Sequence, residues 1–186
     1  DLDQALKWYQ RSASQGFAIA QYRLAAFYER GVGVSFDLER ARNWYARAAA
    51  NGNIKAMHNL GVLATMSKQR QPDYKRAAEW FNKAAMHGLR DSQFNLAILL
   101  GSGLGVSRDL ILASKWFALA ANDGDDDAKR RLAKTKAELT TAQLTIAKKA
   151  VAGWQRRGAP AIANDAHAAG ALWQRRTNVR SSSTKR

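Results

Sequence analysis

The sequence predicts an all-α protein, a right-handed α/α solenoid of four 36-residue helical hairpins with a helix that caps its C-terminal end. Three kinds of residue recur every 36 positions and predict this fold: one that starts helices, large apolar residues, and one that stops helices. We call each set of equivalent positions a column. The columns are Asp1, Asp37, Asp73 and Asp109; Trp8, Trp44, Trp80 and Trp116 with Leu24, Leu60, Leu96 and Leu132; and Gly16, Gly52, Gly88 and Gly124.

Each repeat is expected to begin with a helix that its aspartate caps. In the first repeat Asp1 precedes an apolar pattern from Leu2 to Ala13 that follows one face of a helix. Gly16 is expected to end this helix, because glycine adopts a left-handed backbone without a Cβ penalty.

A second helix is expected from about Phe17 to Arg30, with Leu24 facing inward, and Gly31–Val34 then leads to the next aspartate cap. Each repeat is therefore a helical hairpin that buries its apolar face only against its neighbours. The four repeats are placed at residues 1–36, 37–72, 73–108 and 109–139.

The tryptophan and leucine columns are predicted to form the core. Small residues such as Ala5 and Ala13 let adjacent helices approach, and one large ring per repeat then fills the remaining space. A buried tryptophan of this kind removes roughly 150–250 Å² from water. The alternative is that the indole rings stack on a ligand.

The second repeat lacks the glycine connection. Its loop reads Ser67–Arg70, and Pro72 then enforces a break before the cap at Asp73. This loop is either a contact site for a partner or an ordinary solvated loop.

Residues 140–157 are predicted to form the capping helix. Thr140 and Gln143 have the spacing of a capping box, and an apolar stripe follows that ends at Trp154. Such a helix covers the open end of a repeat array.

Residues 158–186 are predicted to be a basic, partly disordered tail, with a short helix at Asn164–Arg176 and disorder from Ser181. Trp154–Arg157 and Trp173–Arg176 spell the same four letters. The repetition is either a paired contact motif, for a partner or for the array itself, or a coincidence in a biased sequence.

The formal net charge is +15, and residues 141–186 carry more than half of it, with nine Lys or Arg against one acidic residue. This distribution indicates a local electrostatic contact or a solvated end. Absent cysteine excludes disulfides and thiolate metal sites. No stretch approaches the roughly 20 apolar residues that a membrane span needs, and the chain is expected to be a fragment or a mature product.

The columns over residues 1–139, with paired alanines and Gly-x-Gly-Val connections, resemble the Sel-like repeat family, which is related to tetratricopeptide repeats. This resemblance implies helical hairpins and adaptor or scaffold roles. Three stretches are also similar to the repeat region of PodJ-type bacterial polar localisation factors: Lys55–Leu60, Gly88–Leu96 and Lys115–Ala121. That likeness implies the periplasmic part of an inner-membrane protein at a cell pole, although the residues themselves leave a cytoplasmic location open.

No catalytic, cofactor or metal site is expected. His58, His87 and His167 lie too far apart for metal-ligand spacing, and His58 falls in an aromatic column where a packed ring is the simpler reading. The acidic run Asp123–Asp127 does not continue as a calcium loop would, so helix caps explain it better. An enzyme is therefore not expected.

The first helix of each repeat lines the concave groove in related solenoids, so its non-core positions are the candidate partner-binding residues. Recurring basic positions would form a ladder that binds acidic protein segments by charge-assisted hydrogen bonds, the alternative being an ordinary solvated face. The candidates are Lys7, Arg11, Arg40, Asn43, Arg47, Arg76, Glu79, Lys83 and Lys115.

Two functions follow. The first is a non-enzymatic protein-interaction scaffold of the bacterial cell envelope, with a polarity role implied by the resemblance. The alternative is a module that binds peptidoglycan or another glycan, although the tail has no recognisable peptidoglycan-binding domain. Nucleic-acid binding is less favoured than either function, because outside the tail the basic residues are not interleaved with exposed aromatic residues.

Overall fold

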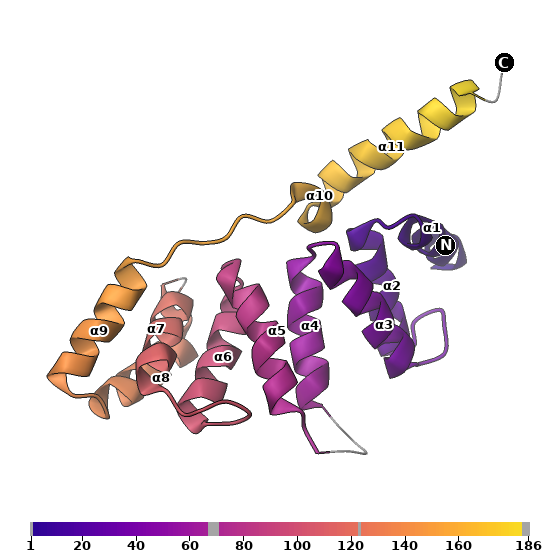
Figure 1. The fold of residues 1–186 in the computed structure, drawn as a ribbon. Coiled ribbons are helices and arrows are strands. Elements are labelled where there is room, and N and C mark those ends of the chain that lie inside the picture. The colour runs from indigo at the N-terminus through magenta and orange to yellow at the C-terminus, as the bar shows by residue number, and fades with distance from the viewer. Residues whose placement is uncertain (1, 67–70, 123, 184–186) are drawn as a thin grey trace. The chain divides into compact units, whose positions relative to one another are not determined.

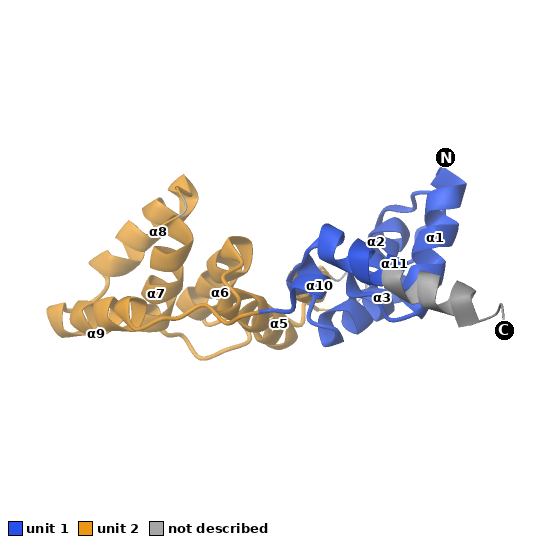
Figure 2. Ribbon diagram, turned by 90° about the horizontal axis from the view of Figure 1, so that it is seen from above, with its two compact units in different colours: residues 1–56, 159–186 blue, residues 57–158 orange. Residues whose placement is uncertain are grey.

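The computed structural model describes residues 2–66, 71–122 and 124–183, with side chains described as far as Gln174. Every regular element in these residues is a helix, as predicted (Figure 1). The chain forms two compact units (Figure 2). Unit 1 comprises residues 1–56 and 159–186, and unit 2 comprises residues 57–158.

Unit 1 contains the first hairpins and the C-terminal segment. Its helices are α1 (Leu2–Ser14), α2 (Ala18–Arg30), α3 (Leu38–Ala50), the start of α4 (Ile54–Thr65), α10 (Ala161–Asn164) and α11 (Ala166–Ser183). Helix α2 packs against α1 and α3, and α10 also contacts α2. The core cluster of this unit is formed by Ala13, Phe17, Ala20 and Leu24.

Unit 2 continues the hairpins. It contains the rest of α4, then α5 (Tyr74–Met86), α6 (Arg90–Ser102), α7 (Leu110–Ala121), α8 (Asp126–Ala137) and α9 (Thr141–Ala152). Helix α6 packs against α5 and α7, and α7 also packs against α8 and α9. The core between α5, α6 and α7 includes Phe81, Leu96, Leu99, Trp116 and Phe117.

The structure confirms predicted helix caps and a predicted helix-ending glycine, which depend only on neighbouring residues. The carboxylate of Asp37 accepts the backbone N–H of Arg40 at 2.9 Å, and Asp73 and Asp109 cap α5 and α7 in the same way. Gly16 has a φ of +88°, the left-handed conformation expected of it. Thr140 and Gln143 make both hydrogen bonds of the capping box at the start of α9.

The tryptophan column is not a uniform core column, which corrects the prediction. Trp116 is 4% exposed, but Trp8 is 54% exposed, and Trp44 and Trp80 are half-buried. The fully packed ring is the next residue along: Tyr45, Phe81 and Phe117 are 0%, 2% and 3% exposed. Successive residues of a helix are rotated by about 100° about its axis. When the following ring points at the second helix of the hairpin, the tryptophan therefore lies at the edge of the packed face.

The leucine column faces the core as expected in three repeats. Leu24, Leu60 and Leu96 are buried, whereas Leu132 is half-buried on α8. Helix α8 is rich in Lys and Arg and has few apolar residues, so it buries less surface than its counterparts.

The C-terminal segment differs most from expectation. Helix α11 runs from Ala166 to Ser183, longer than the predicted helix at Asn164–Arg176, and it includes Ser181–Ser183, where the sequence predicted disorder. The segment from residue 159 onward belongs to unit 1, together with the first hairpins. The altered loop at Ser67–Arg70, considered above as a contact site, lies outside the described residues.

Candidate functional site

Three tryptophans of the repeats each carry a cation on the ring. The guanidinium of Arg47 lies 4.7 Å from the centroid of the Trp44 ring, and the ammonium of Lys83 lies 4.1 Å from that of Trp80. Both pairs are three residues apart, the spacing that places side chains on the same helix face. Lys115 lies 4.6 Å from the ring of Trp116. Each cation–π contact contributes about 0.5–2 kcal/mol, depending on exposure.

These three cations have no carboxylate within ion-pair distance among the described residues. Arg47 and Lys83 are exposed, while Lys115 is half-buried, and burial lowers the pKa of its ammonium group. The indole therefore orients each positive group and leaves it available to an anionic partner.

Arg40 is not available in the same way. Its guanidinium lies 3.2 Å from the carboxylate of Asp37 and also sits over the ring of Tyr28 at 5.5 Å. These contacts tie Arg40 to the start of α3, so its role is structural. Arg76 holds the equivalent place on α5, where its backbone N–H donates to Asp73.

The remaining candidates Lys7, Arg11, Asn43 and Glu79 are exposed. Glu79 also lines a half-open cavity of about 380 Å³ in unit 2, beside Leu112 and Trp116. The candidate residues divide between the units. Unit 1 contains Lys7, Arg11, Arg40, Asn43 and Arg47, and unit 2 contains Arg76, Glu79, Lys83 and Lys115. A single continuous ladder along a groove stays a prediction.

The two tail tryptophans pack on the repeats, which is one of the alternatives that the sequence left open. Trp154 meets Trp116 in an edge-to-face contact with ring centroids 6.4 Å apart, within unit 2. Trp173 meets Trp8 in the same manner at 5.5 Å, within unit 1. The repeated four-letter motif was the available signal, and in both copies its tryptophan packs on a tryptophan of the repeat column.

His58 and His87 each contact a different part of the chain. The Nδ1 atom of His58 lies 2.8 Å from the hydroxyl of the buried Ser92, and its ring packs against Phe81. Burial lowers the pKa of His58, and the nearby Asp91 only partly opposes this effect. His87 contacts the carbonyl oxygen of Arg157 at 3.1 Å. The described residues contain no cluster of three side chains that could hold a metal ion.

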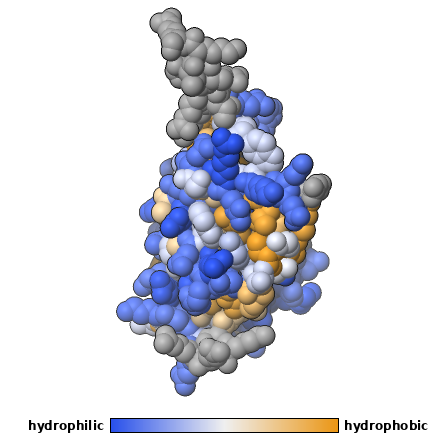
Figure 3. Space-filling view, turned by 90° about the vertical axis from the view of Figure 1, so that its right-hand side faces the viewer, coloured by the Kyte–Doolittle hydropathy of each residue, from blue (hydrophilic) through white to orange (hydrophobic). Residues whose placement is uncertain are grey.

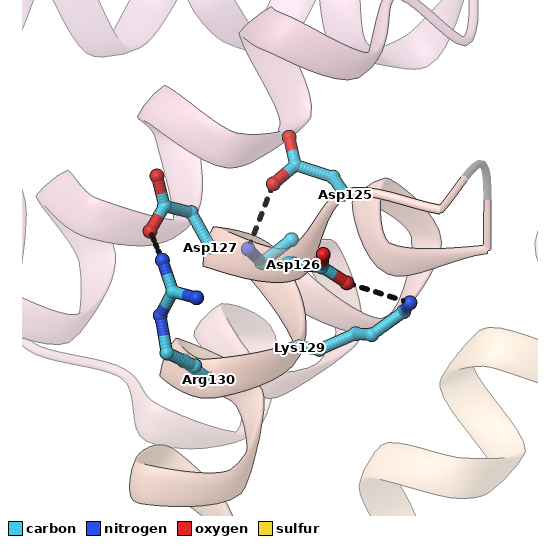
Figure 4. Close-up of polar contacts among 6 residues, drawn as sticks. Asp125, Asp126, Asp127, Lys129 and Arg130 are labelled. Carbon is cyan, nitrogen blue, oxygen red and sulfur yellow. Dashed lines mark hydrogen bonds and ion pairs between the residues drawn. The ribbon is translucent and has the colours of Figure 1, made fainter.

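Three residues of the acidic run, Asp125–Asp127, serve helix α8, as Figure 4 shows, whereas Asp123 lies outside the described residues. Asp125 accepts the backbone N–H of Ala128 at 3.0 Å and so caps the helix. Asp126 pairs with Lys129 and Asp127 pairs with Arg130 one turn later. The hydrogen bond from Lys129 lowers the pKa of Asp126. Asp125 also lies 3.9 Å from the guanidinium of Arg90 on α6, so all three carboxylates have partners within the chain.

The period, the hairpins and the caps agree with one family. The Sel1 repeat profile matches residues 1–17, 18–53, 54–89 and 90–125. The chain belongs to the Sel1 repeat family. Each complete match covers the second helix of one hairpin and the first helix of the next, such as α2 with α3. The family profile therefore has the same 36-residue period, but its repeat boundaries fall between the two helices of a hairpin.

Solved Sel1 structures share this fold. The Sel1 repeat protein of Oxalobacter formigenes is 29% identical with a TM-score of 0.63, over 69% of this chain and 97% of that one. The protective antigen c5321 of uropathogenic Escherichia coli, which displays an SLR fold, is also 29% identical, with a TM-score of 0.56. That match covers 84% of this chain and 42% of the antigen. No curated protein matches the chain.

Sel1 repeats are a non-catalytic scaffold fold whose members bind other proteins. No helix in the described part of this Sel1 protein is both long and apolar enough to cross a membrane. The surface of the repeats is therefore the place to look for function.

The lowered pKa of His58 predicts a pH-dependent stability of the fold. Below about pH 6.5 the unfolded chain binds a proton at this position while the folded chain resists it, so stability is lost as the pH falls toward the folded pKa. Above that pH the contribution is fully present. In His58→Phe, the loss of unfolding free energy between pH 8 and pH 5, measured by urea titration, is expected to be smaller than in the wild type.

His167→Phe is the matched control, since this histidine is exposed on α11 and its variant is expected to keep the wild-type pH dependence. Equal pH dependence in the wild type and His58→Phe contradicts the prediction.

Proposed function

We propose that this Sel1 protein is a non-enzymatic scaffold of the bacterial cell envelope that recruits partner proteins through the first helices of its repeats. The observation that supports this most is the recurrence of a tryptophan that carries a cation on its ring, at Trp44, Trp80 and Trp116, each cation having no carboxylate within ion-pair distance in the part of the chain that the structure describes. The ligand of such a surface is an acidic protein segment.

The chemistry of these pairs favours acidic ligands. A carboxylate that meets an arginine or lysine forms hydrogen bonds about twice as strong as neutral ones. The indole already restricts the cation, so less side-chain entropy is lost when a partner binds. The net charge of +15 adds a long-range attraction that steers acidic partners toward the surface.

The proposed setting is the periplasmic side of the inner membrane at a cell pole. It is supported by the likeness of residues 55–60, 88–96 and 115–121 to the repeat region of polar localisation factors. The scaffold role itself rests on the family and the surface, and it stands without this setting.

A second candidate is a module that binds peptidoglycan. It is favoured by Trp8, whose indole is 54% exposed and so offers an aromatic face of the kind on which sugar rings stack. Retention of the purified chain on isolated sacculi, with no protein partner present, supports this candidate and counts against the first.

The triple variant Arg47→Ala/Lys83→Ala/Lys115→Ala tests the scaffold surface. A fluorescein-labelled decaglutamate peptide is expected to bind it about tenfold more weakly than the wild type, since each of the three cations contributes roughly 0.5 kcal/mol. Fluorescence anisotropy measures the dissociation constants at fixed salt.

The matched control is Lys55→Ala/Lys134→Ala/Lys149→Ala, which removes the same charge from exposed positions away from the tryptophan column. Its affinity is expected to fall less than about twofold, through long-range attraction alone. Equal losses in the two triple variants mean that net charge binds the peptide and contradict the proposed site.

A further inference from the structure

The C-terminal segment docks on unit 1 through a specific set of hydrogen bonds. The Asn164 side chain accepts the backbone N–H of Ile54 at 2.8 Å and donates to the carbonyl of Gly52 at 2.9 Å. The Asn53 side chain in turn donates to the carbonyl of Ala163 at 2.5 Å. The turn between α3 and α4 and the helix α10 therefore satisfy each other's polar groups.

Apolar packing extends this contact along α11. Leu172 and Trp173 pack against the core cluster of unit 1, and the Trp173 ring meets the edge of Trp8 at 5.5 Å. The packing is incomplete, because α1, α2 and α11 leave a half-open cavity of about 390 Å³ lined by Phe17, Arg23 and both tryptophans. The contact thus combines a specific polar anchor with a loosely packed aromatic one.

Other apolar surface of unit 1 is also open to solvent. Leu2, Val32 and Phe36 are exposed, and Figure 3 shows a hydrophobic area framed by hydrophilic side chains on this side of the molecule. Unit 1 consequently offers apolar area beyond what the C-terminal segment covers.

The two four-letter motifs are held differently. The first follows α9 directly and stays in unit 2, where the backbone N–H of Arg157 donates to the carbonyl of Met86 at 2.9 Å. The second is reached through residues 158–160, which follow the first motif and have no regular secondary structure, and it returns to unit 1. Residues 161–174, which we name the arm, are therefore a docking element on a tether.

We propose that the face of unit 1 formed by Trp8, Phe17 and residues 52–54 is a docking site that also accepts the arm of a second copy of this chain. Every arm contact described above is made with unit 1, so a second copy supplies the same atoms in the same geometry. Exchange of arms between copies then joins them without any new interface.

The tether sets the concentration at which exchange occurs. A short link gives the arm an effective concentration on the order of mM for its own unit 1. Exchange between copies is thus minor in dilute protein and grows as the protein concentration approaches that value. Substitutions that disable docking within each copy bring the exchange into a measurable range.

Two variants make the test. Trp8→Ala impairs the docking face and keeps an intact arm, whereas Asn164→Ala/Trp173→Ala impairs the arm and leaves its docking face vacant. Each variant alone is expected to sediment as a monomer at about 100 µM, while an equimolar mixture forms a heterodimer, because only the mixture pairs an intact arm with a vacant face. Sedimentation equilibrium gives the masses, and circular dichroism checks that both variants are folded.

A synthetic peptide of residues 159–174 provides the second measurement. It is expected to bind the Asn164→Ala/Trp173→Ala chain and to dissolve the heterodimer, whereas a peptide with both substitutions does neither. His167→Ala, an exposed position on the arm, is the control variant and should behave as the wild type.

Monomers throughout the mixture, together with no binding of the wild-type peptide to the Asn164→Ala/Trp173→Ala chain, overturn the proposal. Dimers that persist in that variant alone also overturn it, because they must form through another surface. These outcomes are independent of the decaglutamate experiment, which leaves the arm unchanged.

Discussion

The close approach of neighbouring helices at the alanine columns is the constraint on which the rest of this structure depends. Ala41, Ala77 and Ala113 are completely buried at the same point of three successive hairpins. A methyl group at this point lets two helices approach closely, and the ring that follows the tryptophan fills the space beside them. In two of these hairpins the tryptophan, Trp44 or Trp80, is then displaced to the border of the packed face, where it is close enough to solvent to hold a cation.

That displacement connects packing with function. A ring at the border has one face against the core and the other available to Arg47 or Lys83. In the outer repeats an aromatic ring of the chain itself also contacts the tryptophan, namely Trp154 on Trp116, which carries Lys115 as well, and Trp173 on Trp8. The same column thus contacts both cations and aromatic rings of the chain.

Local features of the fold were predictable from the sequence, and features that depend on orientation or distance were not. The capping box at Thr140 and the left-handed Gly16 follow from a few neighbouring residues, and both are present. The burial of Trp8 was mispredicted, because a rotation of about 100° decides between Trp8 and the next residue, and periodicity alone does not resolve it. The docking of Asn164 on Gly52 joins distant parts of the chain, and only the duplicated motif hinted at it.

The central claim is that Trp44 and Trp80 border the core while Tyr45 and Phe81, the rings that follow them, fill it. Comparing the unfolding free energies of Trp80→Ala and Phe81→Ala by urea titration tests it most directly. The account predicts a loss of about 3–5 kcal/mol for Phe81→Ala, which opens a cavity in the core, and only about 1–2 kcal/mol for the half-buried Trp80. An equal or larger loss of unfolding free energy for Trp80→Ala would contradict the account and indicate that Trp80 belongs to the core.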